Sequence, residues 1–99
     1  MKASEMTFES GRCYKAYDKD EGTVRIFKFK AKGKEPGNFN ISRGVRINKS
    51  SVNIDWTIFY IGDNFNIEEI DESLIDKVMK QFNMDRTAIL ATINGKRDE

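Results

Sequence analysis

Apolar and polar residues alternate along much of the first sixty positions, a period of two that is typical of half-buried β-strands. The pattern predicts four strands, at about 12–17, 23–32, 39–49 and 52–61. The clearest turn between them is 33–38, which holds the one proline of the chain between two glycines. Because short connections join consecutive strands, we expect an antiparallel meander.

Alternation also divides each predicted strand into two faces. On strand 23–32, Phe27, Phe29 and Ala31 share one face, and the other face carries two aliphatic residues followed by lysines. Placing the aromatic face inward gives an expected core that consists of Phe27, Phe29, Phe39, Ile41, Val45, Ile47, Ile54, Trp56 and Ile58. Four twisted strands could form an open sheet or curl into a small SH3-like or OB-like barrel, and the pattern leaves both forms open.

After Gly62 the apolar spacing changes to that of a helix. Asn66, followed three residues later by Glu69, forms a capping-box pattern that predicts a helix over about 67–82. Its apolar stripe consists of Ile67, Ile70, Leu74, Ile75, Val78, Met79 and Phe82. We expect this stripe to cover the aromatic face of the sheet.

The segment 83–95 fits two structures. Asp85 could cap a short helix over 86–94 that ends at Gly95, whereas the β-branched residues of 87–93 could form a fifth strand. We favour the helix. The expected fold is therefore α+β, with a sheet over about 12–61 and a helical segment over about 66–94.

The composition places this fold in a single domain over 1–99. A chain of 99 residues has room for one core, and its 11% of aromatic residues supply large side chains to fill it. One cysteine cannot form an intramolecular disulfide, residues 1–6 contain no apolar signal-peptide region, and no apolar run approaches membrane-spanning length. We expect a cytoplasmic protein without a membrane partner.

The residue types also bear on catalysis. The chain has no histidine and a single cysteine, Cys13, which excludes Cys/His zinc sites and Ser-His or Cys-His nucleophilic pairs. The glycines at 33 and 37 lack the spacing of a phosphate-binding loop. We expect no enzymatic activity, no cofactor and no bound metal.

Charge is unevenly distributed although the net charge is only +1. Residues 1–50 hold twelve basic and six acidic residues, and residues 51–99 hold five basic and ten acidic ones. The first candidate site is a basic strand surface for nucleic acid or an acidic partner, made of Lys28, Lys30, Lys32 and Arg46. Alternate side chains about 6–7 Å apart suit successive phosphates. The alternative is a solvated edge strand whose lysines oppose aggregation.

Acidic residues gather on the predicted helix, at Glu68, Glu69, Asp71, Glu72 and Asp76. They could bind a basic protein, or they could form an exposed helix face whose charge suits the helix dipole.

The segment 74–96 resembles the helix-turn-helix of repressor-type DNA-binding proteins. Asn83 would occupy the turn, Asp85 the cap, and Met84 and Ile89 the buried positions. The resemblance implies that Arg86, Thr87 and Ala88 would meet DNA in the major groove. A helical hairpin packed on the sheet has the same pattern.

We therefore expect a small non-enzymatic regulatory or inhibitory protein that binds another macromolecule, with a protein as the favoured partner. Its size and mixed surface are similar in type to those of phage and mobile-element accessory proteins. The alternative is a nucleic-acid-binding regulator that holds DNA or RNA on the basic strand face or on the C-terminal helical pair.

Overall fold

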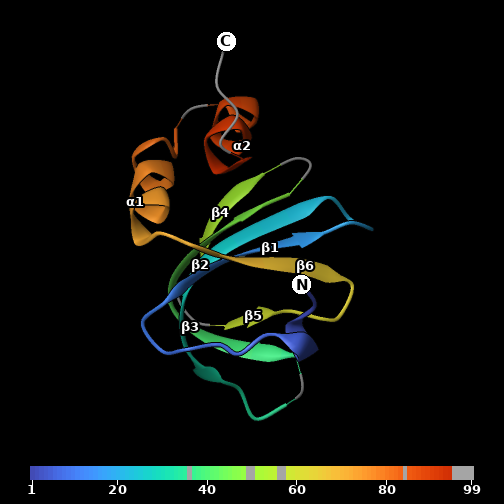
Figure 1. The fold of residues 1–99 in the computed structure, drawn as a ribbon. Helices are drawn as coiled ribbons and strands as arrows, with labels where there is room; N and C mark the ends of the chain where they lie inside the picture. Colours follow the sequence, from blue (N-terminus) through green and yellow to red (C-terminus); the bar gives the residue numbers. More distant parts are fainter. Residues whose placement is uncertain (36, 49–50, 56–57, 84, 95–99) are drawn as a thin grey trace.

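The computed structural model describes residues 1–35, 37–48, 51–55, 58–83 and 85–94. It contains an antiparallel sheet of six strands and two α-helices, which lie together at one end of the sheet (Figure 1). The α+β class predicted from the sequence is confirmed. The elements in chain order are the 3₁₀ helix η1 (Ala3–Glu5), the strands β1 (Cys13–Asp18), β2 (Thr23–Lys32), β3 (Asn38–Ile47), β4 (Val52–Asp55), β5 (Ile58–Tyr60) and β6 (Phe65–Ile70), and the helices α1 (Glu72–Lys80) and α2 (Arg86–Asn94).

The strands form a curved, open sheet. Hydrogen-bonded neighbours follow the order β4-β3-β2-β1-β6, and β5 pairs with the first part of β3. Among the described residues no pairing joins β6 to β4 or β5, so the sheet does not close into a barrel. The count is six strands and not four because the predicted strand 52–61 is present as β4 and β5, and because β6 was not expected.

Arg25 bridges the two strands at the open side of this sheet. Its guanidinium carbon lies 5.4 Å from the ring centroid of Phe59 on β5 and 5.3 Å from that of Phe65 on β6. Its Nη1 also donates a hydrogen bond to the carbonyl of Tyr60. A cation between two aromatic rings thus connects strands that are not neighbours in the sheet order.

A bulge in β3 changes which face its residues occupy. Lys28 of β2 pairs with Arg43 of β3, but the next residue, Phe29, pairs with Ile41, so Ser42 is an extra residue. The inserted residue reverses the alternation, and Phe39 and Ile41 therefore lie on the opposite face from Val45 and Ile47. The prediction of one shared face for these four residues was wrong.

The sheet consequently has a core on each face. The aromatic core, enclosed by the curved strands, consists of Tyr14, Ala16, Phe27, Phe29, Phe39, Ile41, Phe59, Ile61, Phe65 and Ile67. The aliphatic core, between the sheet and the helices, consists of Cys13, Val24, Ile26, Val45, Ile47, Ile75, Val78, Ile89 and Ile93. We expected the helix to cover the aromatic face, and that prediction was wrong: the helices cover the face that carries Val24 and Ile26.

The residues before α1 form a strand and not the first turn of a helix. Phe65 and Ile67 are buried while Asn66 and Glu68 are exposed, which is the alternation of a strand paired with β1. The helix begins five residues later than expected, at Glu72, and its cap is Asp71 and not Asn66. The sequence spacing fits both structures, and pairing with β1 decides for the strand.

Two further predictions concern the C-terminal half. The helix predicted over 86–94 is confirmed as α2. The predictions that Trp56 and Met84 are buried and that Gly95 ends the helix fall outside the described residues. On β5 it is Phe59 that is buried, and Tyr60 is exposed. In the part of the chain that the structure describes, neither helix has the length and apolar character needed to cross a membrane.

Candidate functional site

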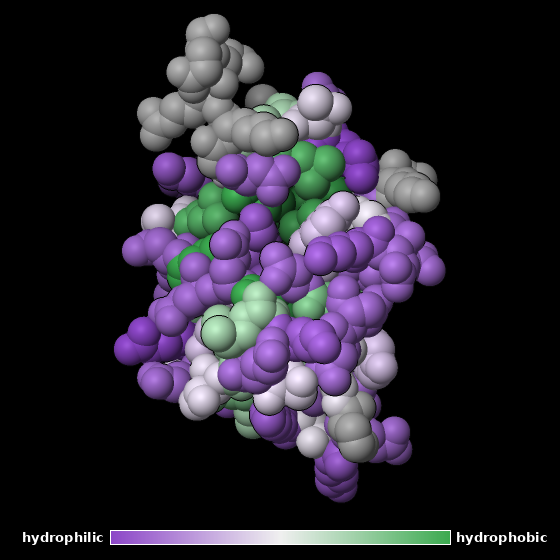
Figure 2. Space-filling model, turned by 45° about the vertical axis from the view of Figure 1, so that its right-hand side comes forward, coloured by the Kyte–Doolittle hydropathy of each residue, from purple (hydrophilic) through white to green (hydrophobic). Residues whose placement is uncertain are grey.

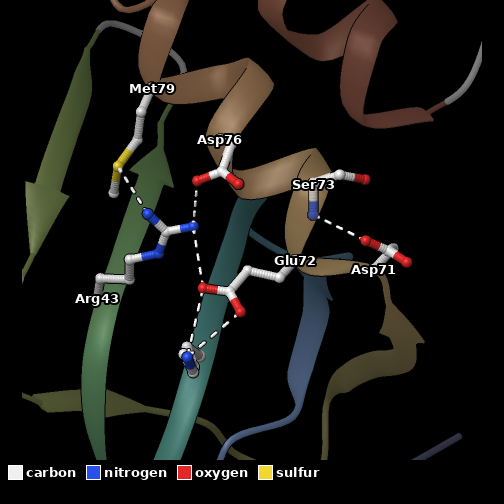
Figure 3. Close-up of polar contacts among 7 residues, drawn as sticks. Arg43, Asp71, Glu72, Ser73, Asp76 and Met79 are labelled. Carbon is white, nitrogen blue, oxygen red and sulfur yellow. Dashed lines mark hydrogen bonds and ion pairs between the residues drawn. The ribbon is translucent and has the colours of Figure 1, made fainter.

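A cluster of charged side chains joins α1 to the sheet. Lys28 and Arg43 face each other on β2 and β3, and Glu72 contacts both, at 3.3 Å from Lys28 Nζ and 3.2 Å from Arg43 Nη2. Asp76, one turn further along α1, also pairs with Arg43 (Figure 3). We call these four residues the charge cluster. Its contacts fix the first turns of α1 on the strands.

The predicted basic surface of Lys28, Lys30, Lys32 and Arg46 is not continuous, because Lys28 belongs to the charge cluster. Lys28 is only 31% exposed and is paired with Glu72. Arg46 of β3 lies directly opposite Arg25 of β2, so these two side chains share one face of the sheet. Arg25 lies three positions before Lys28, an odd number, so the side chain of Lys28 is on the other face. Lys30 and Lys32 are exposed. The structure does not bring the four predicted residues together.

The acidic residues near α1 are largely occupied by partners within the protein. Glu68 lies 2.8 Å from Lys15, and Glu69 lies 2.8 Å from Arg12. Within the described residues, no group of three or more His, Cys, Asp or Glu side chains is arranged to hold a metal ion.

Hydrogen bonding and burial shift three pKa values in this region. The backbone N–H of Ser73 donates to Asp71 (Figure 3) and lowers the pKa of that carboxyl. The hydrogen bond to Glu69 raises the pKa of Arg12. Burial raises the pKa of the Cys13 thiol, and the nearby Glu72 carboxylate raises it further. Both effects disfavour the thiolate, so Cys13 is a poor nucleophile and acts as a packing residue.

The predicted recognition residues lie in the first turn of α2. Arg86 Nε donates to the carbonyl of Asn48, which holds the side chain against the sheet. Asp85 accepts a hydrogen bond of 3.0 Å from the backbone N–H of Ala88, as an N-cap does. Arg86 and Ala88 are partly buried and Thr87 is exposed. The three residues therefore do not form one projecting surface.

A groove runs between α2 and the outer face of β1 and β6. It encloses about 650 Å³ and is lined by Lys15, Tyr17, Gly22, Val24, Asn66, Glu68, Arg86, Leu90 and Asn94. Tyr17 is 39% exposed, and on α2 the lining residues recur every four positions along one side of the helix. We call this the helix–sheet groove. Figure 2 shows hydrophobic surface near the helical end of the molecule, bordered by hydrophilic side chains.

A second hollow lies toward the other end of the sheet. This loop pocket has a volume of about 550 Å³ and is lined by Ala3, Ser4, Lys32, Gly33, Lys34, Glu35, Gly37, Asn38, Phe39, Tyr60, Ile61, Gly62 and Asp63. Its most exposed large hydrophobic side chain is that of Tyr60, at 57%.

Comparison with models of known protein families, with curated proteins and with solved structures gives no match to this chain. The described residues form an α+β domain with an open antiparallel sheet, and this fold by itself does not define a function.

Of the residues that line the two hollows, Lys32, Glu68 and Arg86 were among the candidates from the sequence, and the others, Tyr17 and Tyr60 included, were missed. The four-residue spacing of Arg86, Leu90 and Asn94 could have indicated the groove wall. The adjacent aromatics Phe59 and Tyr60 could have indicated the pocket, because neighbouring strand residues point to opposite faces.

Proposed function

We propose that this protein is a non-enzymatic regulatory or inhibitory module that binds another protein in the helix–sheet groove. The observation that carries the proposal is the exposure of Tyr17 beside Leu90, on a face that the helices otherwise cover. Tyrosine in such a setting supplies a large contact area at small cost in side-chain entropy, and protein interfaces are enriched in it.

The charges of the groove also favour a protein partner. Lys15 is only 17% exposed and lies 2.8 Å from Glu68, so the two charges largely neutralise each other. Arg86 is held by the Asn48 carbonyl. Besides the Glu68 side chain, which is 60% exposed, the lining includes Tyr17, Leu90 and the amides of Asn66 and Asn94. A nucleic-acid site would instead need uncompensated positive charge.

The helix-turn-helix alternative has less support, because Arg86 and Ala88 are partly buried at the start of α2. The proposal includes a cytoplasmic location, which agrees with a free, buried cysteine. The proposed similarity to phage and mobile-element accessory proteins rests on size and mixed surface charge.

The experiment places a photo-crosslinking amino acid at position 17 or, as a control, at position 60. Both tyrosines are exposed, but they lie in different hollows. After capture from a lysate of the native host, the protein crosslinked at position 17 is purified and its affinity is measured by calorimetry. Tyr17→Ala should weaken binding by at least about tenfold, as expected for a central aromatic contact.

The matched control is Tyr60→Ala, which should leave the affinity unchanged. A partner that binds wild type and Tyr17→Ala equally, while both remain folded by circular dichroism, would refute a role for the groove.

A further inference from the structure

The ring of Tyr60 is exposed and yet held in a fixed position. A Cβ atom at Gly37 would lie 2.7 Å from Tyr60 Cε1 and 3.2 Å from Cδ1, so the ring packs directly against the Gly37 backbone. A Cβ atom at Gly62 would lie 3.2 Å from the Tyr60 hydroxyl and 3.3 Å from Cε2. Gly37 has φ +84°, a conformation that other residues rarely adopt. Two glycines thus support the ring and leave it 57% exposed.

Hydrogen bonds connect the described residues of the loop that carries the neighbouring lysines. The N–H of Gly33 donates to the carbonyl of Asn38 at 2.7 Å, and the N–H of Asn38 donates to the carbonyl of Glu35 at 3.1 Å. These bonds close the β2–β3 turn beside Tyr60. Lys32 and Lys34 therefore line the same pocket as the ring.

Positive charge is in excess along this end of β2. Lys30, Lys32 and Lys34 are all exposed. Two acids, Glu35 and Asp63, also line the pocket. Asp63 Oδ1 accepts a hydrogen bond of 3.2 Å from the backbone N–H of Ser4, but this bond does not remove its charge, so the three lysines exceed the two acids by one positive charge.

We infer that the loop pocket binds single-stranded nucleic acid, with a base stacked on Tyr60 and the adjacent phosphates held by Lys32 and Lys34. A fixed aromatic ring next to flexible cations is the combination that recognises unpaired nucleotides. The ring needs an unstacked base, so a duplex is excluded from this mode of binding. This inference goes beyond the proposed protein site and uses different residues. A result that refutes one of the two proposals therefore leaves the other unaffected.

The test is fluorescence anisotropy of the full chain with labelled oligothymidylate and oligouridylate of about 12 nucleotides, which suits the site sizes of such proteins. A duplex of the same length serves as the comparison, and the DNA and RNA single strands show which sugar is preferred. Binding of at least one single strand at low salt, tighter than binding of the duplex, is the expected result.

Variants separate the two parts of the site. Tyr60→Ala should weaken binding about tenfold or more, because stacking on one aromatic ring contributes strongly. Tyr60→Phe should keep binding within about twofold, because the ring is retained. Replacing Lys32 and Lys34 together by glutamine should make the slope of log affinity against log salt shallower by about 1.4, at about 0.7 for each phosphate contact.

Matched controls come from residues that do not line the loop pocket. Tyr17→Ala removes an exposed tyrosine of the helix–sheet groove, and Lys19→Gln removes an exposed lysine of the β1–β2 turn. Neither should change affinity. The inference is overturned if no single strand binds at low salt, if the duplex binds as tightly, or if Tyr60→Ala has no greater effect than Tyr17→Ala. A protein partner lost on Tyr60→Ala without any oligonucleotide binding would also overturn it.

Discussion

The two faces of the sheet are packed in different ways. In the aromatic core, rings from several strands meet largely edge to face, and Phe27 lies 6.0 Å from Tyr14, 6.2 Å from Phe39 and 5.7 Å from Phe59 between ring centroids. The sheet encloses these rings together with the N-terminal segment, from which Ala3, Met6 and Phe8 pack against them. The aliphatic core instead depends on a second layer, since Ile75 and Ile89 come from α1 and α2.

This difference suggests that the two cores have separate roles. The aromatic core lies between the sheet and the N-terminal segment, whereas the helical layer is attached to the sheet through aliphatic contacts and the charge cluster. Regions with few layers to hold them tend to open before the rest of a fold. Because α2 forms one wall of the helix–sheet groove, the stability of the helical layer controls the shape of the proposed protein site.

The largest expected effect on the free energy of unfolding comes from replacing one buried residue of each core by alanine. Phe27→Ala removes a fully buried ring and should lower the free energy of unfolding by about 4 kcal/mol, a large fraction of the total for a domain of this size. Ile75→Ala should cost about 3 kcal/mol. Urea denaturation measures both.

Hydrogen exchange then tests the comparison itself. Phe27→Ala should speed exchange in all strands that surround the ring, whereas Ile75→Ala should speed exchange mainly in α1 and α2. Equal acceleration of sheet and helices in both variants would show that the two cores open as one unit.

A smaller effect is expected from the charge cluster. Arg43→Met keeps an apolar stem but removes the partner of Glu72 and Asp76. Since these acids are 43% and 55% exposed, solvent screens the pairs, and we expect a loss of about 1 kcal/mol at low salt that shrinks as salt is added. Chemical denaturation with urea at two salt concentrations measures this loss.

The control for that variant is Arg12→Met, whose partners Glu9 and Glu69 lie outside α1. Only Arg43→Met should accelerate exchange in α1. A loss of stability that does not depend on salt would contradict a role for the ion pairs of Arg43 in holding the helix.

The smallest effect concerns the cap of α1. The hydrogen bond from Ser73 lowers the pKa of Asp71 in the folded protein. The ionised Asp71 therefore stabilises the fold fully above the ordinary aspartate pKa of about 3.9, and this stabilisation is lost as the pH falls through the lower pKa of the folded protein. Asp71→Asn can still accept the Ser73 hydrogen bond but cannot titrate. The thermal midpoint of wild type should therefore fall more than that of Asp71→Asn between about pH 6 and pH 2, by a few degrees.

Other carboxylates also titrate in this range, so the difference between the two proteins is the quantity to compare. Identical midpoints at every pH would show that folding does not lower the pKa of Asp71. Asp71→Ala should be less stable than both at neutral pH, because the acceptor is missing altogether.

Several elements could be predicted because local alternation and tertiary packing agree. Strand 23–32 and helix 86–94 have the predicted bounds in β2 and α2. The candidate sites were harder to predict, because they depend on which faces remain uncovered. Lys28 was expected on an open basic surface, but α1 brings Glu72 to it. Phe59 was not among the expected core residues, but it is buried on β5, and the adjacent Tyr60 is exposed.

The amino-acid sequence by itself determined which residues are apolar, where the chain turns, and that strands precede helices. Only the tertiary structure decided whether 65–70 is strand or helix and which side of β3 faces the helices. The physical reason is that one inserted residue, Ser42, reverses the alternation of β3, and the residue types of the strand do not indicate where the insertion lies. Likewise, an apolar stripe fits either a strand or a helix until a neighbour such as β1 supplies the hydrogen bonds that select one.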